Sequence, residues 1–249
     1  HVEAGLRSFD REMPEEINRL ITDAIADYLL TPSSDGDENL RNEGVAEDRI
    51  KRVGNVMIDS LFNNLERAKK STIHSDLNIE KGNYGVLTLH RPSNVDEMEA
   101  FSQILDALEQ IGTRIPLVFP LHPRTRNRAE QFGLTERLEL IPNIILTDPA
   151  GYLDFVALMA ESKLVLTDSG GLQEETTALG IPCITLRKNT ERPITVTEGT
   201  NTIVGNDTQA ILDAAFDVLD NGGKAGRIPE LWDGKTAERI ADLVEEIIG

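Results

Sequence analysis

The sequence predicts an α/β protein built around a mainly parallel sheet, and three observations lead to this fold class. From Tyr84 onward, short strand-like runs alternate with helical patterns, which is typical of βαβ units with helices on both faces of the sheet. Near the start of the chain an amphipathic helix presents an apolar stripe that needs a sheet to cover it. Histidine, aspartate, serine and glycine residues stand where the predicted strands end.

The alternating region supplies most of the elements. The predicted strands are the runs YGVLTLH, PLVFPLH, NIILTDP, LVLTDSG, PCITLR and TIVG. Between them the apolar spacing predicts helices near 96–111, 124–132, 151–161 and 171–179. The polar stretch 68–82 is the expected connection to the part of the chain that precedes it.

The opening part differs from the rest. Pro14 and the acids after it predict a helix start, followed by a stripe at helical spacing: Ile17, Leu20, Ile21, Ala24, Ile25, Tyr28 and Leu29. Only short strands at 28–32 and 52–54 accompany this helix. We therefore expect an incomplete first domain over 1–65, whose other strands come from upstream residues or another chain.

The remaining chain is divided by prediction into a second domain, 66–230, and a terminal helix, 231–249. The helix is indicated by a stripe that could pack on either domain: Ile240, Leu243, Val244, Ile247 and Ile248.

Composition excludes several classes of function. The net charge of −18 would repel a phosphate backbone, which argues against a nucleic-acid partner. The sequence has neither a long apolar run nor a basic-then-apolar leader, so a cytoplasmic location is expected and no membrane association. Cys183 stands in an apolar run and is expected in the core, and the four histidines lack the spacing of a helical zinc motif. We predict no metal.

The run LVLTDSGGLQEE carries the best-marked site. A strand followed by Ser169, Gly170, Gly171 and a helix start offers a hydroxyl, unobstructed N–H groups and the positive end of a helix dipole, all suited to a phosphate. A tight turn in which Asp168 or Ser169 caps the helix is the alternative. A carboxylate about one turn into the helix could accept both hydroxyls of a ribose, or merely complement the helix dipole.

Two histidines end predicted strands, where open parallel sheets bind ligands. His90 is followed by Arg91, and together they could reach a diphosphate or a departing oxyanion; His122 has the same position on the next strand. An ordinary structural role is the alternative for both.

Two glutamates near the start are acid/base candidates. Glu15 stands four residues before Arg19, so a solvent-exposed ion pair is the alternative to a catalytic role. Glu3 lies between small residues, where a carboxylate could be held in a cleft.

Taken in order, several motifs resemble the non-hydrolysing UDP-N-acetylglucosamine 2-epimerases. They are HVEAGLRS, MPEEINR, VGNVMID, TLHRPSN, LHPRTR, DPAGYLDFVALM, TDSGGLQEE and TERPITVTEGT. The resemblance implies two Rossmann-like domains of the glycosyltransferase-B type, the first incomplete here, with a Gly-Asp-Thr block upstream of these motifs. It also implies a cytoplasmic homodimer that uses neither a metal nor a nicotinamide cofactor.

The activity that the resemblance implies is the interconversion of UDP-GlcNAc and UDP-ManNAc by elimination and re-addition of UDP. It makes Glu3 and Glu15 catalytic carboxylates and places His90 at the diphosphate. The implied substrate contacts are Ser169, Gly170 and Gly171 at the pyrophosphate, Glu175 at the ribose, Phe155 near the uracil, Arg192 at the sugar or phosphate, and His122 lining the cleft. A hydrolysing epimerase, a glycosyltransferase of the same fold and an inactive UDP-sugar-binding chain are the alternatives.

Overall fold

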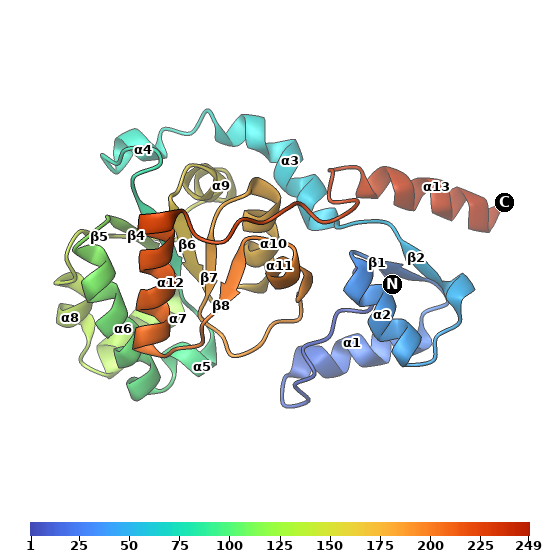
Figure 1. Cartoon of the computed structure of the whole chain (residues 1–249), viewed down its shortest axis with the longest axis horizontal. Helices are drawn as coiled ribbons and strands as arrows, with labels where there is room; N and C mark the ends of the chain where they lie inside the picture. Colours follow the sequence, from blue (N-terminus) through green and yellow to red (C-terminus); the bar gives the residue numbers. More distant parts are fainter.

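The computed structural model describes residues 1–249 except the side chain of Ile248, so that member of the predicted terminal stripe lies outside the described residues. The molecule is elongated and has two parts (Figure 1). A large sheet with its helices forms one end, and the first fifty residues with the C-terminal helix form the other.

The large part contains a six-stranded sheet in which every pairing is parallel. Its order is β5-β4-β3-β6-β7-β8, which, counted along this part of the chain, is the 3-2-1-4-5-6 order of a dinucleotide-binding sheet. The strands are β3 (Gly85–Thr88), β4 (Leu117–Pro120), β5 (Ile144–Thr147), β6 (Leu164–Thr167), β7 (Cys183–Thr185) and β8 (Asn201–Ile203). Each coincides with a predicted strand, and the predicted α/β class is confirmed.

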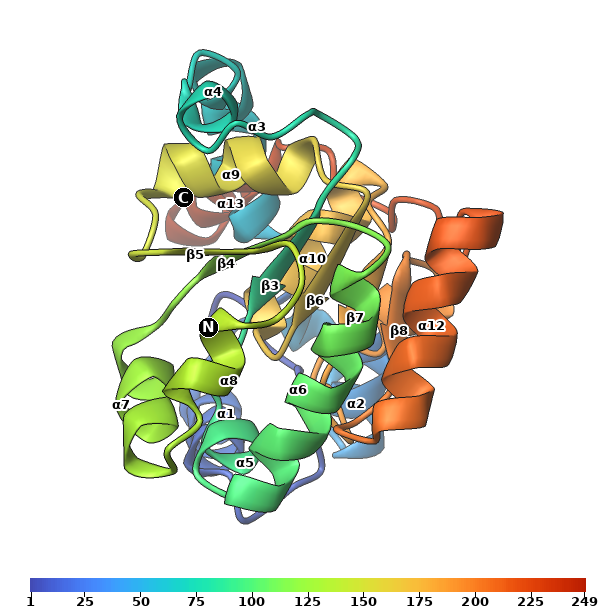
Figure 2. The same ribbon diagram turned by 90° about the vertical axis from the view of Figure 1, so that its left-hand side faces the viewer.

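Helices cover both faces of this sheet, as Figure 2 shows. One face carries α6 (Met98–Gly112) and α12 (Thr208–Asn221), and the other carries α3 (Val56–Ala68), α9 (Tyr152–Ala160) and α10 (Gly170–Leu179). The shorter helices are α4 (Ile73–Asp76), α5 (Pro92–Val95), α7 (Pro123–Gln131), α8 (Thr135–Glu139) and α11 (Ile194–Thr197). The sequence predicted α6, α7, α9 and α10 but missed α3 and α12.

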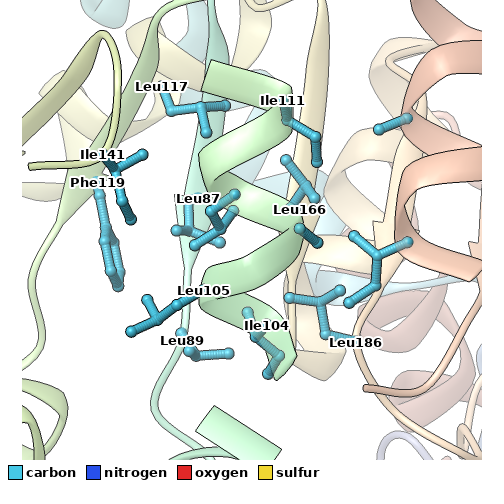
Figure 3. Close-up of a cluster of buried hydrophobic side chains, with 14 of the residues drawn as sticks. Leu87, Leu89, Ile104, Leu105, Ile111, Leu117, Phe119, Ile141, Leu166 and Leu186 are labelled. Carbon is cyan, nitrogen blue, oxygen red and sulfur yellow. The ribbon is translucent and has the colours of Figure 1, made fainter. Parts of the chain in front are cut away.

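The strands have apolar side chains on both faces, so successive residues enter different cores. Leu87 packs into the cluster below α6 and α12, whereas its neighbour Val86 packs into the cluster below α3 and α9. Figure 3 shows Leu87, Leu166 and Leu186 against Ile104 and Ile111 of α6. The sheet is therefore a rigid platform for the loops at its edge.

The smaller part holds α1 (Pro14–Ile25), β1 (Leu29–Thr31), α2 (Ser34–Asn42), a 3-10 turn (Glu47–Arg49) and β2 (Ile50–Arg52). The two strands pair in parallel. The residues that α1 buries are Glu16 and Asp23, whereas Ile21 and Ile25 of its apolar stripe are 55% and 78% exposed.

The C-terminal segment ties the two parts together. Trp232 is 2% exposed and donates from Nε1 to the carbonyl of Pro32 at 2.9 Å. Asp59 of α3 accepts the first backbone N–H groups of α13 (Thr236–Ile248), at 3.1 and 2.7 Å. The terminal helix is thus confirmed, while the domain boundaries at 65 and 230 stay predictions.

Candidate functional site

The order of the main sheet reverses between β3 and β6, which lie side by side at its centre. In an open α/β sheet the loops that leave the carboxyl ends of such a pair diverge and form a ligand crevice. His90 follows β3, and Asp168 and Ser169 follow β6. The topology therefore brings together two motifs that are 77 residues or more apart in sequence.

Asp168 joins these two loops. Its side chain is 0% exposed, and its Oδ2 accepts the backbone N–H of His90 at 2.9 Å, that of Arg91 at 2.8 Å and the amide of Asn94 at 3.2 Å. The other oxygen, Oδ1, lies 3.0 Å from Nδ1 of His90. Burial opposes ionisation, but the contacts with His90 and Arg91 lower the pKa of Asp168, so its carboxylate is charged at neutral pH.

The helix start after β6 is not capped by either residue that the sequence offered. Ser169 is the N-cap of α10 but makes no side-chain cap hydrogen bond, and the carboxylate of Asp168 faces His90 instead. The alternative in which the side chain of Asp168 or Ser169 caps the helix is therefore wrong. The N–H groups of the first turn of α10, beginning at Gly170, have no side-chain cap and are of the kind that suits an anion.

Glycine at 170 permits a close approach of the TERP segment. A Cβ at this position would lie 2.6 Å from Nη1 of Arg192 and 2.7 Å from Oε1 of Glu191. A Cβ on Gly171 would meet open space. The two glycines thus have different functions: the first admits a guanidinium, and the second leaves room in front of the helix.

Arg192 is the centre of a buried network of charges. Its Nε lies 2.8 Å from Glu174 and its Nη1 2.6 Å from Glu191, and its side chain is 14% exposed. Burial opposes the charge, but Glu174 and Glu191 raise the pKa of Arg192. Asn55 also donates to Glu174 at 2.8 Å, so the first acid of the QEE run serves the network.

The second acid, Glu175, has a different environment. Its side chain is 5% exposed, and Oε1 lies 3.5 Å from the hydroxyl of Tyr152 at the start of α9. Burial, and then the charge of Glu174, raise the pKa of Glu175 to about 7. Phe155, one turn along α9, is half-buried against the same core.

A cleft of about 640 Å³ separates the small part from the large one. Asp10, Glu12 and Glu15 line it from the small part, and Arg91, Arg187 and Lys188 line it from the large part. This volume is within the usual range of small-molecule sites, which is about 300–1,000 Å³. The basic wall provides local donors for an anion on a protein whose net charge is −18.

The structure corrects one alternative for Glu15. Arg19 pairs with Glu16, at 2.6 Å, and not with Glu15. Glu16 also accepts the backbone N–H groups of Ser8 and Phe9, both at 2.9 Å. Glu15 is instead exposed on the cleft wall, and its charge acts on Arg91 across the gap.

Glu3 has a backbone conformation that residues other than glycine rarely adopt, with φ at +65°. Such strain concentrates at functional positions, where the surrounding structure holds it in place. Glu3 is half-buried, and its charge acts on both Glu174 and Arg192. It therefore belongs to the same electrostatic environment as the buried network.

His122 lies beside His90, with ring centroids 5.5 Å apart. It is the N-cap of α7, and its Nδ1 accepts the N–H of Arg124 at 3.1 Å. The structure thus brings the two predicted strand-end histidines together. Among the described residues, histidine, cysteine and carboxylate side chains form no group of three that could hold a metal ion.

Comparison with known proteins now adds to this geometry. The model of the family described as UDP-N-acetylglucosamine 2-epimerase matches residues 1–245. The chain belongs to this family. A UDP-N-acetylglucosamine 2-epimerase of Methanocaldococcus jannaschii is 41% identical over 249 residues, a match that covers 98% of this chain and 68% of the relative.

Solved members of the epimerase family have the same fold. The crystal structure of the Methanocaldococcus jannaschii UDP-GlcNAc 2-epimerase in complex with UDP-GlcNAc and UDP has a TM-score of 0.89 and 41% identity, and covers 99% of this chain and 68% of that one. The Neisseria meningitidis UDP-GlcNAc 2-epimerase bound to UDP-GlcNAc has a TM-score of 0.87, 29% identity and coverages of 99% and 69%. The resemblance inferred from the motifs is confirmed.

One relative in the family has a different substrate name. A UDP-2,3-diacetamido-2,3-dideoxy-D-glucuronate 2-epimerase of Pseudomonas aeruginosa is 39% identical over 255 residues and covers 99% of this chain and 68% of its own length. Both names describe a 2-epimerase that acts on a UDP-sugar. The shared part of the chemistry is thus the nucleotide and the reacting carbon.

Sequence reasoning missed three members of the site of this epimerase-family chain. Asp168 was considered only as a helix cap, although an aspartate at a strand end could have been matched with His90 on the neighbouring strand. Arg187 and Glu191, which pair at 2.8 Å, lie next to Arg192 in the fold. Charged residues directly after a predicted apolar strand were a signal for a site. Their partners, however, depend on the order of the strands in the sheet.

Proposed function

We propose that this chain catalyses the reversible C2 epimerisation of UDP-GlcNAc to UDP-ManNAc. The observation that carries the proposal is the arrangement at the switch point, where His90 and the N-cap of α10, whose side chain makes no cap hydrogen bond, follow adjacent strands and Arg91 lines a basic cleft wall. A diphosphate requires donors of this kind. The matched family and the ligands of its solved members support the same substrate.

The proposed reaction has two steps. A carboxylate removes the C2 proton, the C–H electron pair forms the C1=C2 bond of a 2-acetamidoglucal, and the C1–O pair leaves with UDP. A proton then returns to the other face of C2 and UDP adds again at C1. Glu3 and Glu15 are the proposed carboxylates, since one belongs to the charged network and the other lines the cleft.

The nucleotide contacts form the other half of the proposal. Ser169, Gly170 and Gly171 hold the diphosphate, with His90 stabilising the charge that develops on the leaving group. Glu175 accepts the ribose hydroxyls and Phe155 borders the uracil. Arg192 orients the sugar or phosphate through the network that it centres, and His122 lies beside His90 at the ligand. A cytoplasmic homodimer is part of the proposal, and size-exclusion chromatography with light scattering tests the dimer.

Incubation with UDP-GlcNAc in D2O tests the reaction. We expect NMR to detect UDP-ManNAc, with deuterium at C2 of both epimers, because each passage through the glucal exchanges that position. Free ManNAc would instead indicate a hydrolysing epimerase, and sugar transfer only when an acceptor is added would indicate a glycosyltransferase. Tight UDP binding with no turnover would favour a binding protein, and the 2,3-diacetamido-glucuronate substrate is assayed in parallel.

The ribose contact has its own test. With uridine, which has no phosphate, we expect calorimetry to show affinity rising from pH 6 to pH 8 as Glu175 ionises about its pKa of about 7. Glu175→Gln should weaken uridine binding by roughly 10- to 100-fold at pH 8, as expected for charged hydrogen bonds. Glu66→Gln, at an exposed position, is the matched control. Equal affinity in the parent protein and the Glu175→Gln variant would exclude the ribose assignment.

A further inference from the structure

The most constrained group at the switch point is a carboxylate that the proposed mechanism does not use. Asp168 is fully buried, and its Oδ2 already accepts three N–H donors. Its second oxygen lies 3.0 Å from Nδ1 of His90. The imidazole is 40% exposed, so one edge of the ring faces the carboxylate while the ring still reaches solvent.

This contact determines which nitrogen of His90 carries the proton. An ionised carboxylate only accepts hydrogen bonds, so at 3.0 Å it favours a proton on the ring atom that faces it, although the angle of this contact lies outside that of a regular hydrogen bond. Nδ1 is therefore protonated, and the lone pair of the neutral ring is on Nε2. A carboxylate that holds a histidine in this way selects its tautomer and orientation.

We propose that Asp168 is a positioning residue: it holds His90 in the Nδ1–H form and directs Nε2 towards the crevice beside the start of α10. The role in catalysis rests on the proposed function, but the tautomer itself does not. In the direction of UDP departure, a doubly protonated ring fixed in this way donates from Nε2 to the diphosphate. Without Asp168 the ring would sample both tautomers and several orientations.

The same carboxylate also links the two loops of the crevice by hydrogen bonds. Asp168 belongs to the loop after β6, whereas the N–H groups of His90 and Arg91 belong to the loop after β3, and Arg91 returns a contact from Nε to the carbonyl of Asp168 at 3.1 Å. The position of the His90 ring is thus fixed relative to the start of α10, which would hold the diphosphate. Asp168 acts through His90 and is not itself expected to touch the substrate.

Asp168→Asn distinguishes this role from a merely structural one. The carboxamide oxygen can still accept the N–H groups of His90 and Arg91, so the loops should keep their fold. Its NH2 group then faces Nδ1, which must become the acceptor, and the proton moves to Nε2. The substitution is nearly isosteric; it removes the negative charge and reverses the polarity of the contact with the ring.

The direct measurement is long-range 1H–15N NMR of the imidazole rings near neutral pH. The chain has four histidines, His1, His74, His90 and His122, so single His→Gln variants assign every signal. We expect His90 to be the Nδ1–H tautomer in the parent protein and the Nε2–H tautomer in Asp168→Asn. A parent His90 in the Nε2–H form, or an unchanged tautomer in the variant, overturns the proposal whether or not the chain is an epimerase.

Kinetics of the UDP-GlcNAc reaction give the second readout. We expect Asp168→Asn to lower kcat by about 100-fold or more with little change in KM, because the neutral amide no longer stabilises the doubly protonated ring that donates from Nε2 to the departing diphosphate. His90→Gln combined with Asp168→Asn should be no slower than His90→Gln alone, because residues that act as a unit are not additive. A double variant that is slower still would mean that Asp168 acts independently of His90.

Asp59→Asn is the matched control. Asp59 is also a buried aspartate that accepts two backbone N–H groups, but the groups that it contacts belong to α13 and not to a histidine. It should lower thermal stability without altering the His90 tautomer or kcat. If the parent chain makes no UDP-ManNAc, the proposed function fails while the NMR result still decides the positioning of His90.

Discussion

The two parts of the molecule differ in how completely their helices and strands bury apolar side chains. In the large part, strands such as β6 are buried on both faces between helices, and apolar side chains fill both cores. In the small part, α1 buries Glu16 and Asp23 while Ile21 and Ile25 remain exposed, and the buried apolar cluster is small: Ala4, Leu29, Leu40 and Ile50, with Ala26 and Val45 against it. Polar contacts therefore order the small part, whereas apolar burial orders the large one.

This difference suits the proposed chemistry. The large part is rigid enough to hold a network of buried charges around Arg192, which a weaker core would not tolerate. The small part carries Glu15 to the cleft, and its scaffold is ion-paired: Asp23 contacts His1 and Arg7. Loss of apolar side chains should therefore affect stability most in the large part, and loss of polar contacts most in the small part.

The largest effect is expected in the large core. Phe101 of α6 is 0% exposed, so Phe101→Ala removes a buried ring and leaves a cavity. We expect a loss of about 3–5 kcal/mol in the free energy of unfolding, measured by urea denaturation. A loss below about 1 kcal/mol would contradict the view that this core determines the stability of the large part.

A pH-dependent effect of about 3 kcal/mol is expected at Glu175. Burial raises its pKa from 4.5 to about 7, so the protonated form is favoured in the folded chain. Its contribution is fully present below about pH 4.5, declines as pH rises and is lost above about pH 7. Glu175→Gln should therefore be more stable than the parent at pH 8, by about 3 kcal/mol, with the gain vanishing near pH 4. Parallel stability–pH curves for the two proteins would contradict this.

The smallest effects are expected on α1, and they test the comparison most directly. Glu16→Ala leaves the N–H groups of Ser8 and Phe9 without their acceptor and Arg19 without its partner, which should cost about 1–3 kcal/mol. Ile25→Ser, at a 78% exposed position on the apolar stripe, should change stability by less than about 0.5 kcal/mol. Hydrogen exchange of α1 amides measures both; the reverse order would mean that apolar packing orders this helix after all.

The sequence predicted the fold with few errors because the periodic signals are local. Every strand of the large sheet and the helices α6, α7, α9 and α10 follow from alternation and spacing within a few residues. The helices α3 and α12 were missed although both begin with a side-chain N-cap, Asn55 and Asp207, and α12 buries Ile211, Leu212, Ala215 and Val218 at helical spacing. The inverted burial of α1 was not predictable from its stripe, because it depends on which residues other segments place against the helix.

For the site, the sequence alone identified the candidates and their order: the strand-end histidines, the Ser-Gly-Gly turn, the QEE run and the TERP segment are all visible as residues at the ends of elements. Only the tertiary structure decided how they are paired. Sheet order places β3 beside β6, and this adjacency turns Asp168 from a supposed helix cap into the partner of His90. The packing around α10 likewise gives Glu174 and Glu175 different partners, Arg192 from the segment after β7 and Tyr152 from α9. Spacing along a chain encodes which residues share an element, whereas contacts between elements depend on how the sheet is assembled.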